Sequence, residues 1–172
     1  MVQTIEVVLD ADLDAAVRRE WAVLADAGLP SQALHLGLTN APHVTLGVSS
    51  ALSEGAAAVL RGVPLPGEIR LGGLLVFRAR TAVVARAVVP SPALLATHAA
   101  IDAALADAPG RPDHTLPGRW TPHVTLARRL DGGQLAQALD LLADAPRELV
   151  GEVAALRHWD SDATSVSVLR SR

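Results

Sequence analysis

The same five residues occur twice in this chain, and this repeat constrains the fold more than any other feature. The pentapeptide Pro-His-Val-Thr-Leu occupies residues 42–46 and again residues 122–126, at an offset of 80 (123 − 43). Coincidence is a poor explanation for such a repeat in a chain of 172 residues. The repeat therefore predicts an internal duplication, and it predicts that other elements recur at the same offset.

The offset pairs further segments of the same type. Each half begins with an apolar, strand-like run and an amphipathic helix, and each pentapeptide is followed by a capped helix and another strand. In the first half these segments are residues 5–9, 12–27, 53–61 and 69–77, and in the second half they are residues 85–89, 92–107, 131–143 and 149–159. One more strand is expected at residues 164–169, beyond the two copies.

This order of segments predicts an α+β fold. The run 69–77 is followed closely by a second strand over 83–89, which favours a hairpin and mainly antiparallel pairing. We expect a single domain over residues 1–172, with two pseudo-twofold-related lobes of antiparallel sheet and flanking helices, each lobe carrying one pentapeptide on a strand. The two copies span roughly residues 1–80 and 81–160, and the C-terminal strand follows them.

Side chains of each pentapeptide alternate between the two faces of its expected strand. Residues i and i+2 point the same way, so His43 lies beside Thr45, and His123 lies beside Thr125, while the valine and leucine face the core. Twofold placement then brings both polar pairs to one cleft. Two imidazoles can take a proton from an attacking oxygen and give one to a leaving oxygen near neutral pH. Threonine hydroxyls can hold phosphate oxygens and stabilise the charge that builds on them.

The two His-x-Thr-x elements, at residues 43–46 and 123–126, resemble those of the 2H phosphoesterase superfamily, specifically its 2′,5′ RNA ligase-like branch of RNA 2′,3′-cyclic phosphodiesterases. The resemblance covers essentially the whole chain. It implies a bilobed α+β fold and metal-independent hydrolysis of 2′,3′-cyclic phosphates, at RNA ends or in small cyclic nucleotides, to 2′-phosphomonoesters, a reaction that is reversible as 2′,5′ ligation. It also implies that His43 is the proton donor, that His123 is the proton acceptor, and that no cofactor is needed.

Several residues around the second pentapeptide are further candidates. If strand alternation continues, Arg128 points away from the cleft, so Arg119 is the better candidate for a phosphate ligand. The Pro- and Gly-rich loop 108–118 leads into the pentapeptide and is expected to face the substrate. Trp120 suits either packing or substrate binding.

Aromatic residues are few, at 2% of the chain. Phe77 and Trp159 end equivalent strands and are expected to pack in the core rather than stack on a base. The alternative function is a duplicated nucleotide- or RNA-binding module without catalysis, in which the paired histidines are ordinary strand residues. Such a module needs exposed aromatic side chains on its sheet, which this sequence scarcely supplies.

The composition and the net charge limit which partners the protein can be expected to bind. The net charge of −3 argues against general attraction to long nucleic acid, so we expect a small nucleotide or an RNA terminus as substrate, and no stable nucleic-acid complex. The chain has no cysteine, and the histidine pair lacks acidic residues at ligand spacing, so no metal site is expected. Residues 1–9 read as a strand rather than a signal peptide, and we expect a cytoplasmic monomer without membrane contact.

Overall fold

The computed structural model describes residues 2–37 and 39–172, and its strands form one antiparallel sheet of seven. The sheet has the order β2-β1-β6-β3-β4-β5, and β7 pairs with β6 beside this path. The strands are β1 (Gln3–Leu9), β2 (His43–Ser49), β3 (Glu68–Arg78), β4 (Ala82–Val88), β5 (His123–Leu130), β6 (Leu149–Asp160) and β7 (Ser165–Ser171). The helices are α1 (Ala11–Asp26), α2 (Glu54–Leu60), α3 (Pro92–Ala104) and α4 (Gly132–Leu141), with short 3-10 turns η1 (Gln32–Leu34) and η2 (Asp113–Thr115). The predicted α+β class with antiparallel pairing is confirmed.

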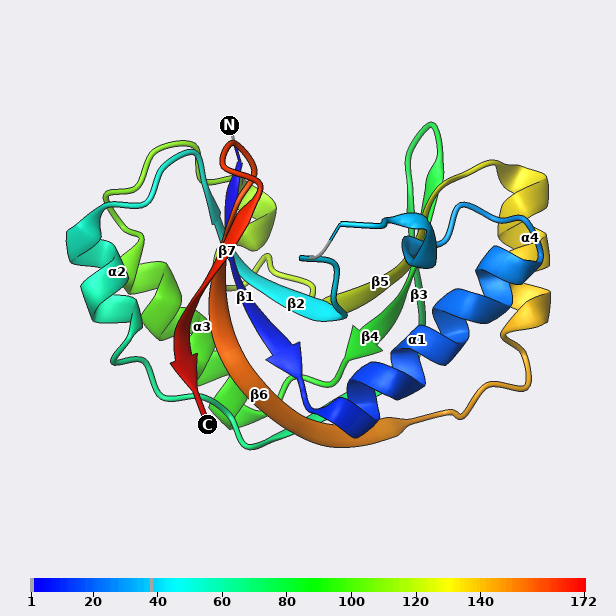
Figure 1. Ribbon diagram of the computed structural model, residues 1–172, viewed down its shortest axis with the longest axis horizontal. Helices are drawn as coiled ribbons and strands as arrows, with labels where there is room; N and C mark the ends of the chain where they lie inside the picture. The colour runs from blue at the N-terminus through cyan, green and yellow to red at the C-terminus, as the bar shows by residue number, and fades with distance from the viewer. Residues whose placement is uncertain (1, 38) are drawn as a thin grey trace.

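The long strand β6 joins two lobes, along the lower edge of the molecule in Figure 1. Its C-terminal part pairs with β1 and β7, and its first four residues pair with β3. One lobe therefore contains β1, β2 and β7, and the other contains β3, β4 and β5. The strands that carry the pentapeptides, β2 and β5, are the two ends of the strand order and come together between the lobes (Figure 1).

The two halves of the chain have the same order of elements, but their first helices are exchanged between the lobes. Each half runs strand, helix, strand, helix, strand. Helix α1, from the first half, packs against β5 and α4, whereas α3, from the second half, packs against β2 and α2. The packing of α3 is close, because a Cβ atom at Gly47 would lie 2.7 Å from Cδ1 of Leu105. The common origin of the halves and the single-domain boundaries remain predictions.

Helix positions follow from local capping signals in the sequence. Asp10, Ser53, Ser91 and Asp131 each precede a helix, and each side chain accepts a hydrogen bond from a backbone N–H in the first turn. The predicted apolar face of α1 is buried, with Leu13, Val17, Trp21 and Leu24 at 3% exposure or less. Within the described residues, no helix combines the length and the apolar character needed to cross a membrane.

The alternation predicted for the pentapeptides is confirmed at their apolar positions. The side chains of Val44, Leu46, Val124 and Leu126 are at most 1% exposed and belong to one hydrophobic core. Their burial fixes the rotation of each strand about its axis. The histidine and the threonine of each strand alternate with these apolar residues and must therefore point to the opposite face.

Candidate active site

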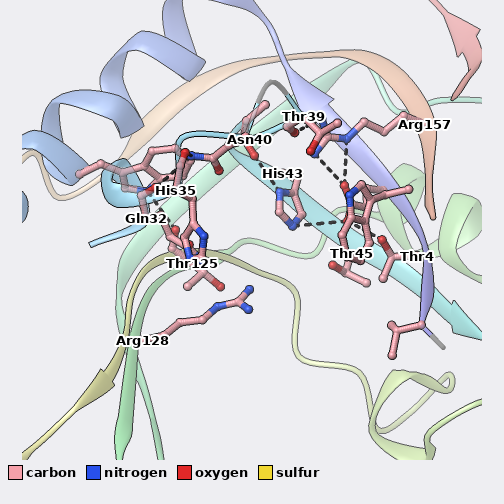
Figure 2. A pocket seen from close by; sticks show the side chains of 16 residues that line it. Thr4, Gln32, His35, Thr39, Asn40, His43, Thr45, Thr125, Arg128 and Arg157 are labelled. Carbon is pink, nitrogen blue, oxygen red and sulfur yellow. Dashed lines mark hydrogen bonds and ion pairs between the residues drawn. The ribbon is translucent and has the colours of Figure 1, made fainter. Parts of the chain in front are cut away.

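A cavity of about 390 Å³ lies where β2 approaches β5 (Figure 2). Its wall contains three of the four predicted motif side chains, together with groups from β1, β6 and the segment before β2. The polar residues that line it are Thr4, Glu6, Gln32, His35, Thr39, Asn40, His43, Thr45, Thr125, Arg128 and Arg157. Among the residues that the structure describes, no three His, Cys, Asp or Glu side chains are grouped closely enough to hold a metal ion.

Both motif histidines are anchored to the backbone in the same way. Nδ1 of His43 lies 2.7 Å from the carbonyl oxygen of Ala41. Nδ1 of His123 lies 2.8 Å from the carbonyl oxygen of Thr121. In each copy the acceptor precedes a proline, which restricts that residue to extended conformations, so the same local sequence builds the same anchor twice. Because a carbonyl oxygen only accepts, each Nδ1 carries a proton, and Nε2 is the nitrogen available for proton transfer.

His123 lies beside the cavity rather than in its wall. The centroid of its ring is 4.7 Å from that of Phe77. Burial lowers the pKa of His123, its backbone hydrogen bond opposes this shift, and the positive charges of Arg128, His43 and His114 lower the pKa further. These influences favour a neutral imidazole with a free electron pair on Nε2, which is the form that accepts a proton.

His43 faces a carboxylate that sequence reasoning missed. Oε1 of Glu6 lies 3.5 Å from Nε2 of His43, and Thr4 donates its hydroxyl hydrogen to the same oxygen. Arg157 donates from Nε to the other oxygen of Glu6, at 2.9 Å, and its Nη2 lies 2.8 Å from that oxygen in an ion pair. The sequence does contain a sign of this ion pair. Glu6 and Arg157 are the single charged residues inside two apolar strand runs, residues 5–9 and 153–159. Such a residue must find a partner if it is buried.

Arg128 lines the cavity, contrary to the expectation from strand alternation (Figure 2). Ala85 and Val84 are consecutive on β4, but their partners on β5, Thr125 and Ala127, enclose the extra residue Leu126. This β-bulge reverses the alternation beyond the pentapeptide and turns Arg128 to the side of the motif threonine. Burial lowers the pKa of Arg128 and the charge of Glu6 raises it, but a guanidinium remains protonated near neutral pH.

The loop 108–118 and Arg119 do not contribute to the cavity wall. The side chain of Arg119 is 65% exposed, and its guanidinium lies 2.7 Å from the carboxylate of Asp113. The loop is tied to α3 instead, because His98 Nε2 lies 2.9 Å from the carbonyl oxygen of Thr115. The loop therefore lies outside this cavity wall, although the charge of its His114 lowers the pKa of His123. That the loop faces the substrate stays a prediction. Its Pro and Gly content marked an irregular segment but could not show that this segment packs on a helix.

Two tryptophans connect the two halves of the chain at the motif threonines. Trp21 donates from Nε1 to the backbone oxygen of Thr125, at 3.0 Å. Trp120 donates from Nε1 to the backbone oxygen of Thr45, at 2.9 Å. The indole of Trp120 also stacks on the ring of His98, with centroids 4.0 Å apart and planes 7° from parallel. The sequence left packing and substrate binding open as roles for Trp120, and these contacts are packing contacts.

The remaining tryptophan has a different environment from the one expected. Trp159 is only partly buried and forms part of the cavity wall. Its strand β6 lies beside β1, where Trp159 pairs with Thr4. The expectation that Trp159 packs only in the core is therefore wrong. The position of Trp159 at the end of a strand could not show that this end of the strand borders the cavity.

Comparison with known proteins identifies relatives of the whole fold. A family model for the 2′-5′ RNA ligase superfamily matches residues 12–164. TT0787 of Thermus thermophilus is 19% identical with a TM-score of 0.59, covering 98% of this chain and 95% of its own. Escherichia coli LigT in its apo form is 17% identical with a TM-score of 0.57, covering 99% and 98%. Kluyveromyces marxianus Usb1 with uridine monophosphate is 16% identical with a TM-score of 0.52, covering 98% and 97%. No curated protein sequence matches.

Proposed function

The chain belongs to the 2′-5′ RNA ligase superfamily of 2H phosphoesterases, and on this premise we propose that it hydrolyses 2′,3′-cyclic phosphates to 2′-phosphomonoesters. His43 is the proton donor and His123 the proton acceptor. The matching anchors of the two imidazoles carry the proposal, because both present Nε2 for proton transfer while differing in the charges around them.

The proposed reaction is one displacement at phosphorus. His123 takes a proton from water through Nε2 as the water oxygen forms a bond to phosphorus. The bond from phosphorus to the 3′ oxygen breaks, and His43 gives its Nε2 proton to that oxygen. The products are a 2′-phosphate and a 3′-hydroxyl group, and proton exchange with solvent restores both histidines. With a 5′-hydroxyl group in place of water as the nucleophile, the same two proton transfers form the bond from phosphorus to the 5′ oxygen and break the bond to the 3′ oxygen, which is 2′,5′ ligation.

Charge that builds on the phosphate needs donors that are already in position. Arg128 supplies a permanent positive charge, and the hydroxyl groups of Thr45 and Thr125 line the same cavity. We assign these three side chains to the non-bridging phosphate oxygens. Arg128 takes this role in place of Arg119, because only Arg128 lies in the cavity wall.

The cavity favours a small substrate or a chain terminus. It is of the size of ordinary small-molecule sites, and Trp159 offers an aromatic surface for a nucleobase. Supporting this class of substrate, the similar Usb1 structure contains uridine monophosphate. The net charge of −3 is consistent with recognition of an end rather than of a long strand.

Incubation with each 2′,3′-cyclic mononucleotide in excess chelator tests the proposal directly. We expect turnover that is unchanged by the chelator and a product that is the 2′-phosphate, identified by chromatography against both isomers. Turnover that disappears in chelator and returns with a divalent ion would contradict the metal-independent mechanism. Binding of the nucleotide without turnover would instead favour the non-catalytic binding module.

A further inference from the structure

Both ring nitrogens of His43 face oxygen atoms that accept hydrogen bonds. Nδ1 is 2.7 Å from a backbone carbonyl oxygen, and Nε2 is 3.5 Å from Oε1 of Glu6. A carbonyl oxygen and an ionised carboxylate have no hydrogen to donate. A proton on each nitrogen, which gives the imidazolium form, supplies the donor at Nδ1 and places a positive charge within ion-pair distance of the Glu6 carboxylate.

Glu6 is held in place by groups that compensate its charge. Nε of Arg157 donates to Oε2, and Nη2 forms an ion pair with the same oxygen, which leaves Oε1 to Thr4 and His43. Glu6 is 4% exposed and Arg157 is 7% exposed. A carboxylate this deeply buried requires an ion pair and hydrogen bonds to remain charged, and these contacts provide both.

The other charges around His43 act in the opposite direction. Arg157 on β6 and Arg128 on β5 are cations, and His35 and His123 add positive charge if they become protonated. Glu6 is the one carboxylate among the described residues that line the cavity. The charges that shift His123 are all positive, so the two histidines differ in the sign of the charge they face.

We propose that Glu6 is a positioning residue that keeps His43 protonated and directs Nε2, and thereby makes His43 the acid of the pair. Arg157 and Thr4 position Glu6 in turn. This inference rests on the proposed function, in which His43 must enter the reaction carrying two protons. Because the two pentapeptides are identical, they cannot determine which histidine gives the proton. The contact with Glu6 supplies that difference.

Titration of the histidine ring signals by NMR in the free enzyme tests the inference without any substrate. The His43 signals are assigned by their absence in His43→Ala. In Glu6→Gln we expect the His43 midpoint to fall by about one pH unit, the lower end of the effect of an opposite charge at this distance, because Arg157 offsets part of the charge. The alkaline limb of the kcat/KM profile should move by the same amount in the same direction.

Glu20→Gln is the matched control. Glu20 is 6% exposed and paired with the buried Arg86, as Glu6 is with Arg157, but it lies on α1 outside the cavity wall. We expect the His43 titration to be unchanged in this variant. Glu6→Asp, which keeps the charge, should retain most of the wild-type midpoint.

A folded Glu6→Gln protein with a wild-type His43 midpoint overturns the inference. If this variant does not fold, the double variant Glu6→Met with Arg157→Met removes the pair without leaving a buried charge alone. A lower His43 midpoint there supports the inference, and an equal or higher midpoint overturns it. If wild-type protein turns over no cyclic phosphate while the midpoint still falls in Glu6→Gln, the proposed function fails but the role of Glu6 in protonating His43 stands.

Discussion

At the scale of single residues, the two motif histidines share their neighbours in sequence but not in space. Each is anchored through Nδ1 to the carbonyl two residues earlier. Glu6 then approaches His43, whereas Arg128 and His114 place positive charge near His123. Identical pentapeptides can therefore perform opposite halves of one proton transfer. The sequence pattern predicts the pair, and the surrounding strands give each member a different charge environment.

The threonine hydroxyls give the first test at this scale. Thr45→Val and Thr125→Val keep the β-branched shape and remove only the donor, and the tryptophan hydrogen bonds at these positions use backbone oxygens that remain. We expect each variant to lower kcat/KM by roughly 10- to 1,000-fold. Steady-state kinetics and a thermal melt check both points. Wild-type turnover in the double variant would leave the threonines as strand formers only.

Arg128 and Arg119 provide a second residue-level test, because they are the two candidates for the phosphate. We expect Arg128→Met to lower kcat/KM by about 100-fold, since a charged donor to the developing phosphate charge is lost. Arg119→Met removes an exposed side chain whose recorded partner is Asp113, and should change kcat/KM little. The reverse pattern in the two assays would restore the assignment made from strand alternation.

At the scale of elements, the sequence predicts what is local and misses what depends on tertiary contact. Four polar caps and the buried stripe of α1 are visible in the sequence, and they place the helices to within a few residues. The bulge in β5 is not visible. It forms where Ala127 bridges to Ser31 and the N–H of Arg128 donates to the Pro30 carbonyl, contacts with a segment nearly one hundred positions away. Alternation beyond the pentapeptide therefore gave the wrong face for Arg128.

A substitution at Trp120 tests how much its hydrogen bond from the second half of the chain to β2 contributes to stability. Trp120→Phe removes the Nε1–H donor and leaves the carbonyl of Thr45 without that partner, while an aromatic ring remains for His98. We expect the free energy of unfolding to fall by about 1–3 kcal/mol. Denaturant titration measures this loss. If stability is unchanged but KM rises, Trp120 contacts the substrate, which is the other role the sequence left open.

At the scale of the whole molecule, the exchange of α1 and α3 between the lobes could not be predicted from the sequence. The apolar stripe of α1 shows that one face is buried, but not which lobe buries it. In the structure each of these helices packs on the lobe that carries the other half's pentapeptide. Trp21 and Trp120 then cross between the halves to the motif threonines. Each half thus supports the motif of the other.

The dependence of stability on pH also belongs to the whole molecule. Burial is the first cause that lowers the pKa of His98, His123 and His158 in the folded state. An unfolded histidine titrates near pH 6.5, so below this pH the unfolded chain binds more protons, and stability falls as the pH falls. We expect a lower Tm at about pH 5 than at about pH 7.5. His98→Gln should reduce this difference, and a Tm that is constant or rises on acidification would contradict it.

The central claim, that His43 and His123 act together in one displacement, is tested most directly by a double-mutant cycle on a 2′,3′-cyclic nucleotide. His43→Ala, His123→Ala and the double variant are compared with wild type by kcat/KM and its pH profile. Groups that act as a unit give strongly non-additive losses, so we expect the double variant to be little slower than the slower single variant, and each single variant to lose one limb of a bell-shaped profile. Losses that multiply, or single variants that keep near-normal rates and both limbs, would contradict the claim.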